Sequence, residues 1–396
     1  MSTPPSNNGT TKPEVAIIGA GLGGLLLGQL LEQIEVPYHI YERATVVKPL
    51  GTAMALGPSI LPVFEQLGLL DELKKFALPC YSADMYNANI EKLGSLDLKD
   101  HDKLLGTHNL IFARQRLYDL MLSRVPAHKV SHGKKVLHTE EKDDNKIHIY
   151  CADNTHYSAD FVVGADGAYS TLRQNMYKRL DEKGVLPPSE LEKMTLASLN
   201  MVGVAVPEDP DKYPQLKDPF CHFSVVVGEN GSRSWGVMSA TDNTICWSLV
   251  VQLSETEAQT MEFQNAEWSP ESIESMYKEF ENAPCPWGGT MGDVMKYTPK
   301  DRISKVFLEE KNFHVWYDLR TVLLGDACHK MLPGAGLGAV NAMQDAVVLA
   351  NCIYNMTDNA QSSITAAFKE YHGQRHHRLE GQIKRSQAMT ALMGGE

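Results

Sequence analysis

The spacing of hydrophobic residues changes several times along this chain. Residues 15–18 are apolar, leucines then recur at helical spacing through 25–31, and a second run rich in aromatic residues occupies 38–41. This order predicts a strand, a helix and a second strand. Helical spacing returns at 60–67 and at 114–124, which predicts two further helices.

Shorter runs typical of strands follow around 136, at 147–151 and at 161–163. We expect these strands to return to the first sheet, because strands that alternate with helices usually build one parallel sheet.

Between about 180 and 300 the pattern changes to the alternation of antiparallel strands. Apolar runs at 223–227, 235–239 and 245–251 are separated by short stretches rich in Asn, Asp and Gly. Such spacing predicts an antiparallel sheet inserted into an α/β domain. An inserted sheet can form the second wall of a cleft, so we expect a substrate to bind there.

The last hundred residues resume the first pattern. A short strand is predicted at 321–324 and a long helix at 337–354. A final packing helix is predicted through 365–393, with basic residues on its outer face; the residues at helical spacing include Phe368, Tyr371, Arg375, Leu379 and Ile383. The whole pattern predicts an α/β fold with an inserted antiparallel sheet and C-terminal helices.

Composition and charge narrow the possible partners. The chain carries 37 Lys and Arg and 49 Asp and Glu, for a formal net charge of −12, which argues against an extended nucleic-acid surface. Its seven cysteines are scattered without a CxxC pair, so free thiols in a reducing compartment and no metal site are expected. Residues 1–13 are polar and predicted to be disordered, and no apolar stretch is long enough for a transmembrane helix.

The first glycine-rich motif follows the first predicted strand. Gly19 allows a tight turn, Gly21 lets the backbone approach a diphosphate, and Gly24 lets the helix lie close to the strand. Glu42 ends the second strand, where a carboxylate can accept hydrogen bonds from ribose hydroxyls. The motif therefore predicts a Rossmann-type dinucleotide site, since a strand and a helix flank it as this chemistry requires.

Two later motifs extend this site. GADGAYSTLR follows the strand at 161–163 and places Asp166 between glycines, with Arg173 nearby as a positive charge. GDACHKMLPGAGLGAVNAMQDA begins at Gly325, and its Asp326 could accept a hydrogen bond from a ribityl hydroxyl. Its later glycines, Gly334, Gly336 and Gly338, could bring main-chain amides and a helix N-terminus against a cofactor ring.

In their order and spacing, the three motifs resemble the group A FAD-dependent monooxygenases, the para-hydroxybenzoate hydroxylase-like family. Three shorter strings, FARQRLYDLML, HGKKV and His329-Lys330-Met331, resemble the fungal epoxidases and hydroxylases of indole-diterpene and meroterpenoid pathways. The resemblance implies a Rossmann-like FAD-binding domain, discontinuous over 14–180 and 300–360. It also implies a substrate-binding β-sheet domain at 181–299 and a C-terminal helix at 361–396.

The resemblance also implies cofactor contacts, which run from the adenosine end of FAD to its ring. Glu42 and Arg43 would meet the adenosine, Val136 the adenine, Arg114 the diphosphate or ribityl region, and Asp326 the ribityl chain. The ring would lie near Ala55, Pro333, Gly336, Gly338 and Ala339. Relatives often carry an Arg or Tyr near the substrate in the strand at 194–205, whereas this chain offers only Ser198 and Asn200, so the catalytic residues stay unassigned.

The implied reaction uses NAD(P)H to reduce FAD and dioxygen to form a flavin hydroperoxide, which delivers one oxygen atom to a small hydrophobic substrate. Hydroxylation of an aromatic ring and epoxidation of a prenyl group both stay open, as do the choice of NADH or NADPH and the oligomeric state. Two other functions compete: an FAD-dependent dehydrogenase or reductase that inserts no oxygen, and a non-enzymatic FAD-fold binding protein. A cytoplasmic location is expected, with peripheral contact to a membrane surface open.

His329 is the histidine nearest the expected flavin. Either it assists proton movement, or it only packs and caps locally.

Overall fold

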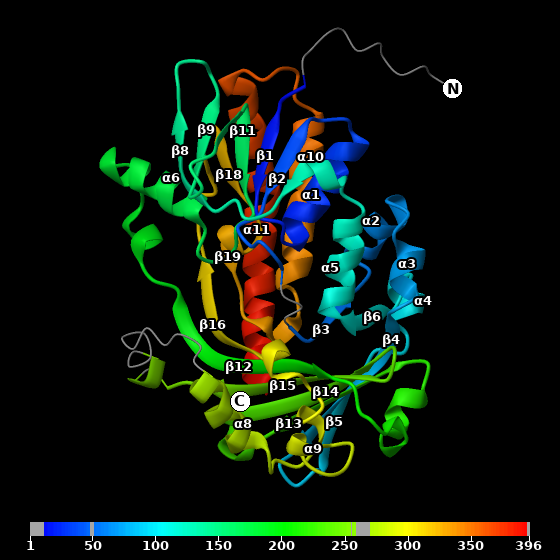
Figure 1. Cartoon of the computed structure of the whole chain (residues 1–396). Coiled ribbons are helices and arrows are strands. Elements are labelled where there is room, and N and C mark those ends of the chain that lie inside the picture. The colour runs from blue at the N-terminus through cyan, green and yellow to red at the C-terminus, as the bar shows by residue number, and fades with distance from the viewer. Residues whose placement is uncertain (1–11, 48–50, 255, 259–269, 394–396) are drawn as a thin grey trace.

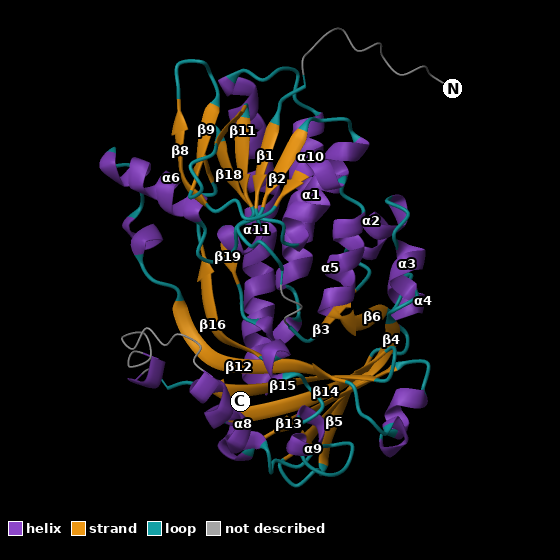
Figure 2. Ribbon diagram, in the orientation of Figure 1, coloured by secondary structure: helices purple, strands orange, loops and turns teal. Residues whose placement is uncertain are grey.

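The computed structural model describes residues 12–47, 51–254, 256–258 and 270–393. Residues 1–11 of the segment expected to be disordered lie outside this range. The molecule has an upper body, in which helices cover a largely parallel sheet, and a lower body built on a large sheet that crosses beneath it (Figures 1 and 2). The long helix α11 runs between the two bodies.

The upper sheet has six strands in the order β17-β18-β11-β1-β2-β7. All neighbours are parallel except the β17–β18 hairpin. Its strands are β1 (Val15–Ile18), β2 (Tyr38–Tyr41), β7 (Val130–Ser131), β11 (Phe161–Gly164), β17 (Tyr317–Asp318) and β18 (Thr321–Leu323). β11 pairs with β1 on one side and β18 on the other, so segments far apart in sequence share the centre of the sheet.

Helices α1 (Leu22–Gln33) and α10 (Gly338–Tyr354) pack against each other beside this sheet. α11 (Gln361–Met393) packs against α10 and buries Phe368, Tyr371 and Leu379. The predicted strands at 15–18, 38–41 and 321–324 and the predicted helices at 337–354 and 365–393 are therefore confirmed. Their periodic apolar faces match the buried faces, which is the expected relation for elements that build one core.

The strands expected around 136 and at 147–151 do not join the first sheet. They form a separate antiparallel sheet of three strands, β8 (Val136–Glu141), β9 (Ile147–Cys151) and β10 (His156–Ala159). Asn145 and Asn154 adopt positive φ in the two connecting turns, and such tight turns pair neighbouring strands with each other. Only the strand at 161–164 returns to the six-stranded sheet.

The lower sheet has ten strands, in the order β19-β16-β12-β15-β14-β13-β4-β6-β3, with β5 paired to β4. From the middle of the chain come β12 (Thr195–Ala205), β13 (Cys221–Val227), β14 (Arg233–Ala240) and β15 (Thr244–Gln252). The remaining strands are β3 (Ala53–Leu56), β4 (Leu78–Asn87), β5 (Lys92–Asp97), β6 (Asn109–Ala113), β16 (Ser304–Asn312) and β19 (His329–Lys330). The sequence placed β3 to β6, β16 and β19 in the FAD-binding ranges 14–180 and 300–360, whereas in space they extend the lower sheet.

Shorter helices complete the molecule. α2 (Leu61–Gln66), α3 (Leu70–Lys74), α4 (His101–Leu105) and α5 (Arg114–Ser123) lie together on one side of the upper body. α6 (Thr171–Glu182) follows β11, and α8 (Pro270–Phe280) and α9 (Met291–Met295) lie below the large sheet. The 3₁₀ turns are η1 (Ala127–Lys129), η2 (Pro188–Leu191), η3 (Pro210–Lys212), η4 (Pro214–Lys217), η5 (Glu229–Gly231), η6 (Lys300–Arg302), η7 (Gly325–Ala327) and η8 (Pro333–Ala335). Among the described helices, none has the length and apolar character needed to span a bilayer.

Candidate cofactor site

The first two motifs meet at the carboxyl ends of the neighbouring strands β1 and β11. Gly19 has φ +109°, and a Cβ on it would lie 2.3 Å from the carbonyl oxygen of Ala165. A Cβ on Gly24 would lie 2.1 Å from the carbonyl oxygen of Gly19. Any side chain at either position would therefore collide with backbone, so these two glycines are required by the fold of the loop.

The N-terminus of α1 is open in front of this loop. Gly21 is the N-cap residue, no side chain caps the helix, and its first turn contains no acidic residue. A Cβ on Gly21 would meet only the Ala165 carbonyl oxygen, at 4.0 Å. The first backbone N–H groups of a helix lack internal partners and attract anions. The end of α1 therefore suits a diphosphate.

Glu42 supports the glycine loop from the end of β2. One carboxylate oxygen accepts the Ala20 N–H at 2.8 Å, and the other accepts the Ala44 N–H at 2.8 Å. Each carboxylate oxygen can accept more than one hydrogen bond, so capacity for ribose hydroxyls remains. Arg43 beside it is exposed, and Val136 is buried at the start of β8. The sequence predicted a ribose contact for Glu42 but not its hydrogen bond with the Ala20 N–H, which holds the glycine loop.

Ala55 lies in β3, and Arg114 is the first residue of α5. Ala55 pairs with Ile111 across β3 and β6, and the Arg114 N–H donates to the Thr52 carbonyl at 2.9 Å. A Cβ on Gly51, which has φ +119°, would lie 3.2 Å from Cδ of Arg114. The Arg114 side chain therefore lies along the 51–52 loop.

Asp166 organises the second motif rather than facing outward. It is half-buried, and its Oδ2 accepts the Thr171 N–H at 2.7 Å at the start of α6. Burial raises the pKa of this carboxyl. Its Oδ1 is buried without a hydrogen-bond partner among the described residues.

Arg173 was expected to supply positive charge near the diphosphate, but in the structure its guanidinium binds backbone carbonyls. Its guanidinium donates to the carbonyls of Ala168 at 2.6 Å and Ala327 at 2.7 Å, and it lies 3.9 Å from the centre of the Phe313 ring. Arg173 thus joins the second motif to the third.

The third motif closes against the first. A Cβ on Gly23 would lie 2.7 Å from the Leu324 side chain and 3.1 Å from the carbonyl oxygen of Ala342. Gly325 adopts φ +62°, and its N–H donates to Oδ2 of Asp345 at 2.9 Å. Because each motif contacts another, all three surround one region, as the sequence predicted.

The residues expected near the cofactor ring follow this turn. Asp326 is half-buried, and its Oδ2 accepts from Lys330 Nζ at 2.7 Å. Pro333 and Gly336 are exposed, and Gly336 has φ +65° with no atom near the position of a Cβ. α10 begins at Gly338, followed by Ala339, again with no side-chain cap and no acid in its first turn. This second open helix end suits a negatively charged or electron-rich group.

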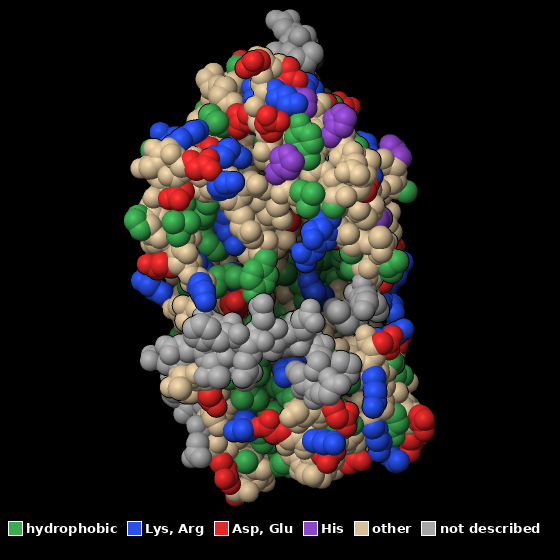
Figure 3. Space-filling view, turned by 60° about the vertical axis from the view of Figure 1, so that its left-hand side comes forward, with side chains coloured by type: hydrophobic (Ala, Val, Ile, Leu, Met, Phe, Trp, Pro, Cys, Tyr) green, Lys and Arg blue, Asp and Glu red, His purple; other side chains and the backbone are tan. Residues whose placement is uncertain are grey.

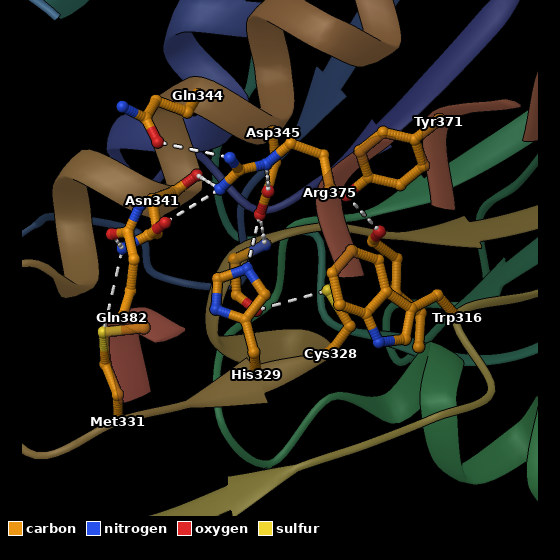
Figure 4. A network of polar contacts seen from close by, with 12 residues as sticks. Trp316, Cys328, His329, Met331, Asn341, Gln344, Asp345, Tyr371, Arg375 and Gln382 are labelled. Carbon is orange, nitrogen blue, oxygen red and sulfur yellow. Dashed lines mark hydrogen bonds and ion pairs between the residues drawn. The ribbon is translucent and has the colours of Figure 1, made fainter. Parts of the chain in front are cut away.

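A buried polar network lies behind the third motif (Figure 4). Oδ2 of Asp345 lies 2.5 Å from Nε2 of His329, and its Oδ1 accepts from Nε of Arg375 at 2.6 Å. Arg375 also donates to the Asn341 side chain at 2.8 Å and to Gln344 at 3.2 Å. Burial alone would raise the pKa of Asp345, but the pairings with His329 and Arg375 hold it below its usual range.

This network has the ligand types of a metal centre but is better explained without one. The ligand atoms of Cys328, His329 and Asp345 lie within 4.8 Å of one another. The Asp345 carboxylate, however, is already paired with Arg375, and burial raises the pKa of the Cys328 thiol well above its usual value. A buried cation beside Arg375 would add an uncompensated charge. We interpret the group as an ion-pair network that joins α10, α11 and the third motif.

The network accounts for the position of His329 and shows a role for Arg375 that the sequence did not predict. His329 is buried within it, which agrees with local packing. Arg375 lies at the same helical spacing as apolar and aromatic residues of the last helix, and an arginine at such a position was the available signal for a buried partner.

One side of the lower sheet faces the three glycine-rich motifs. Its other side packs on α8 and α9 through a core that includes Met201, Trp247, Met276 and Met291. In the space-filling view the surface is hollowed above the residues drawn in grey, with hydrophobic side chains and Lys or Arg side chains at its border (Figure 3). The fold therefore offers a second wall opposite the three motifs.

This arrangement is typical of Rossmann-type flavoproteins: one open helix end suits a diphosphate, and a second open helix end lies opposite a sheet wall. The family described as "FAD binding domain" matches residues 12–386. The chain therefore belongs to this FAD-binding family, and the predicted cofactor, FAD, is confirmed.

Comparison with individual proteins agrees. The FAD-dependent monooxygenase atmM of Aspergillus flavus is 25% identical over 392 residues, 96% of this chain and 78% of the relative. HpxO of Klebsiella pneumoniae, solved with FAD and uric acid, has a TM-score of 0.75 at 21% identity and covers 97% of this chain and 89% of its own. The 2,6-dihydroxypyridine-3-hydroxylase of Arthrobacter nicotinovorans has a TM-score of 0.74 at 16% identity, covering 96% and 94%. The predicted resemblance, the fold class and the assignment as an FAD-dependent monooxygenase are confirmed.

Proposed function

We propose that this FAD-dependent monooxygenase inserts one oxygen atom from dioxygen into a small hydrophobic substrate held between the upper body and the lower sheet. The convergence of the three glycine-rich motifs opposite a half-exposed sheet wall is the observation that carries this proposal. When bound, FAD accepts electrons from NAD(P)H and activates dioxygen, so the protein itself supplies binding, orientation and exclusion of water.

Different residues would bind different parts of FAD. The open N-terminus of α1, with Gly19, Gly21 and Gly24, would hold the diphosphate, and Glu42 and Arg43 the adenosine ribose. Val136 would border the adenine, and Arg114 the diphosphate or ribityl region. The Ala20 N–H donates to the Glu42 carboxylate and the Lys134 N–H to the Glu42 carbonyl, so the glycine loop, Glu42 and the segment before Val136 lie together, which supports this assignment.

At the other end, Asp326 would accept from the ribityl chain with the capacity that Lys330 leaves. Ala55, Pro333, Gly336, Gly338 and Ala339 would border the ring. Asp166 acts behind these contacts, because its hydrogen bond to Thr171 orders the second motif. A cytoplasmic location fits seven cysteines that are all free and buried, and peripheral membrane contact for a lipophilic substrate belongs to the same proposal.

The decisive experiment uses purified enzyme with a candidate substrate, NAD(P)H and ¹⁸O₂. We expect a yellow protein, ligand-stimulated NAD(P)H oxidation and one labelled oxygen atom in the product. Oxidation of the substrate without label would identify a dehydrogenase, and a preparation that binds no flavin and oxidises no NAD(P)H would identify a binding protein. Either result would refute the proposal.

A further inference from the structure

The strand β12 presents different residues to its two sides. Met201 and Ala205 belong to the core that contains α8 and α9 below the sheet. Because successive side chains of a strand point to opposite faces, Asn200, Val202 and Val204 point toward the upper body.

The upper face of the sheet is partly open, whereas the lower face is closed. Met201, Trp247 and Leu249 on the lower face are all 0% exposed. On the upper face, Val250 of β15 is half-buried and Val306 of β16 is 38% exposed. These two valines are the register partners of Asn200 on its two sides. Asn200 therefore lies in the middle of a wall that is accessible from the cleft.

Asn200 and Ser198 have unsatisfied polar atoms in this wall. Oδ1 of Asn200 and Oγ of Ser198 are buried and have no hydrogen-bond partner among the described residues. The valines that flank Asn200 cannot supply one. Ser198 is fully buried, but Asn200 is half-buried, so part of this residue is exposed at the wall. A buried polar atom without a partner costs about 1–3 kcal/mol, so a hydrogen-bond donor supplied to Asn200 from outside the chain would be stabilised there.

The same wall continues to the expected cofactor ring. Met238 and Phe223, on the upper face of β14 and β13, pack in one cluster with Ala53 and Ala55. Met238 pairs with Cys246, and Cys246 pairs with Val204. From Val204 to Asn200 the strand advances by four residues, or about 13 Å. Met238 and Val204 are two strand spacings, or about 10 Å, apart, so Asn200 lies roughly 16 Å from Met238. An elongated molecule of about that length with its reactive end near Ala55 could therefore reach Asn200.

We propose that the carboxamide of Asn200 binds a neutral hydroxyl or carbonyl group at the end of an elongated, largely apolar substrate. This inference rests on the proposed function, because it places the oxidised end of the substrate at the flavin. The neighbours of Asn200 on this face, Ser198, Val202, Val250 and Val306, carry no formal charge. An ionised group would therefore be buried without a counter-charge, so the wall selects against carboxylates and ammonium groups.

The test compares three probes of one length: farnesol, its methyl ether and farnesoate. Dissociation constants are measured on the FAD-loaded enzyme from the change in flavin absorbance, without turnover. We expect farnesol to bind most tightly. Asn200→Leu should weaken farnesol about five- to tenfold, as loss of one neutral hydrogen bond predicts, and leave the ether within twofold. Asn351→Leu, an exposed position on α10, is the matched control and should change neither.

A second readout separates binding from a structural role. Because Asn200 has an unsatisfied atom in the free enzyme, Asn200→Leu should leave the melting temperature unchanged or raise it. A structural asparagine would lower it. Asn200→Ser, which keeps a hydroxyl, should retain part of the preference for farnesol.

The inference is overturned if no probe changes the flavin spectrum, if the ether or farnesoate binds as well as farnesol, or if Asn200→Leu keeps the preference for farnesol. Failure of the proposed function is a separate result, since it would be seen as missing ¹⁸O in the product of the wild-type enzyme. The binding comparison does not depend on that outcome.

Discussion

Replacing Arg375 by methionine tests whether the buried network holds the third motif in place. The substitution keeps an unbranched side chain of similar length but removes the cation. Arg375 and Asp345 are 2% and 0% exposed, and their Nε and Oδ1 atoms are 2.6 Å apart. The variant therefore leaves a carboxylate buried with His329 and the Gly325 N–H as its remaining partners.

Breaking one side of a buried ion pair costs about 3–5 kcal/mol, because the remaining charge stays out of water. The lost contacts to Asn341 and Gln344 belong to the same change, so they are not added separately. For a chain of 396 residues the entropy of unfolding is about 0.8 kcal/mol/K, so we expect a decrease in melting temperature of roughly 4–6 °C. Since Asp345 also accepts from Gly325, directly before Asp326, FAD should dissociate more readily as well.

Differential scanning calorimetry and flavin-release fluorescence measure the two effects. Arg378→Met, at an exposed position on the same helix, is the matched control and should stay within 1 °C of the wild type, roughly the ±0.5 kcal/mol of ordinary surface substitutions. The double variant Arg375→Met with Asp345→Asn should recover part of the loss, because no unpaired charge remains. If Arg375→Met melts within 1 °C of the control, the network contributes nothing and the reasoning fails.

Three further outcomes follow from the same structure. Gly19→Ala should abolish FAD retention, because its Cβ would clash with the Ala165 carbonyl. Gly68→Ala, also at positive φ but in open space, is the control and should retain FAD. Equal FAD retention by the two variants in equilibrium dialysis would contradict this. The native thiols should resist a disulfide reagent at pH 8, since all seven cysteines are buried and burial raises the pKa of Cys246 to about 12, and rapid reaction of several would argue against this packing. The folded-state pKa of Asp345 is lowered, so its stabilising contribution is present above the unfolded value near 4 and is lost as pH falls. Asp345→Asn should therefore reduce the loss of unfolding free energy at acid pH, as measured by urea unfolding at several pH values.

The sequence predicted best those helices and strands whose hydrophobic period agrees with the glycines and turn residues at their ends. The strand at 15–18 and the helix after it form from local sequence, and Gly24 is required by its contact with Gly19 in the same loop, whereas Gly19 is required by its contact with Ala165 of the second motif. The third motif was predicted equally well, because Gly325 and Gly336 adopt the positive φ that their turns require.

The division into bodies could not be predicted in the same way. β3 to β6 come from the first part of the chain, yet β4 pairs in parallel with β13, about 140 residues later in the sequence. Local patterns report which face of a strand is buried, but not which strand lies beside it. The expected boundary near residue 180 followed the change of pattern rather than the pairing of the strands.

Asn200 shows the same limit at the scale of one side chain. The sequence presented it only as one of two polar residues in the strand where relatives often carry an Arg or Tyr, and did not assign it a role. The structure gives it significance through two facts that depend on distant segments: its register partners are Val250 and Val306, and its Oδ1 has no partner among the described residues. Cofactor binding in this fold relies on backbone and glycines, which short motifs record. Substrate selection relies on the side chains that distant strands bring together on one face, so it has to be derived from the register of the sheet.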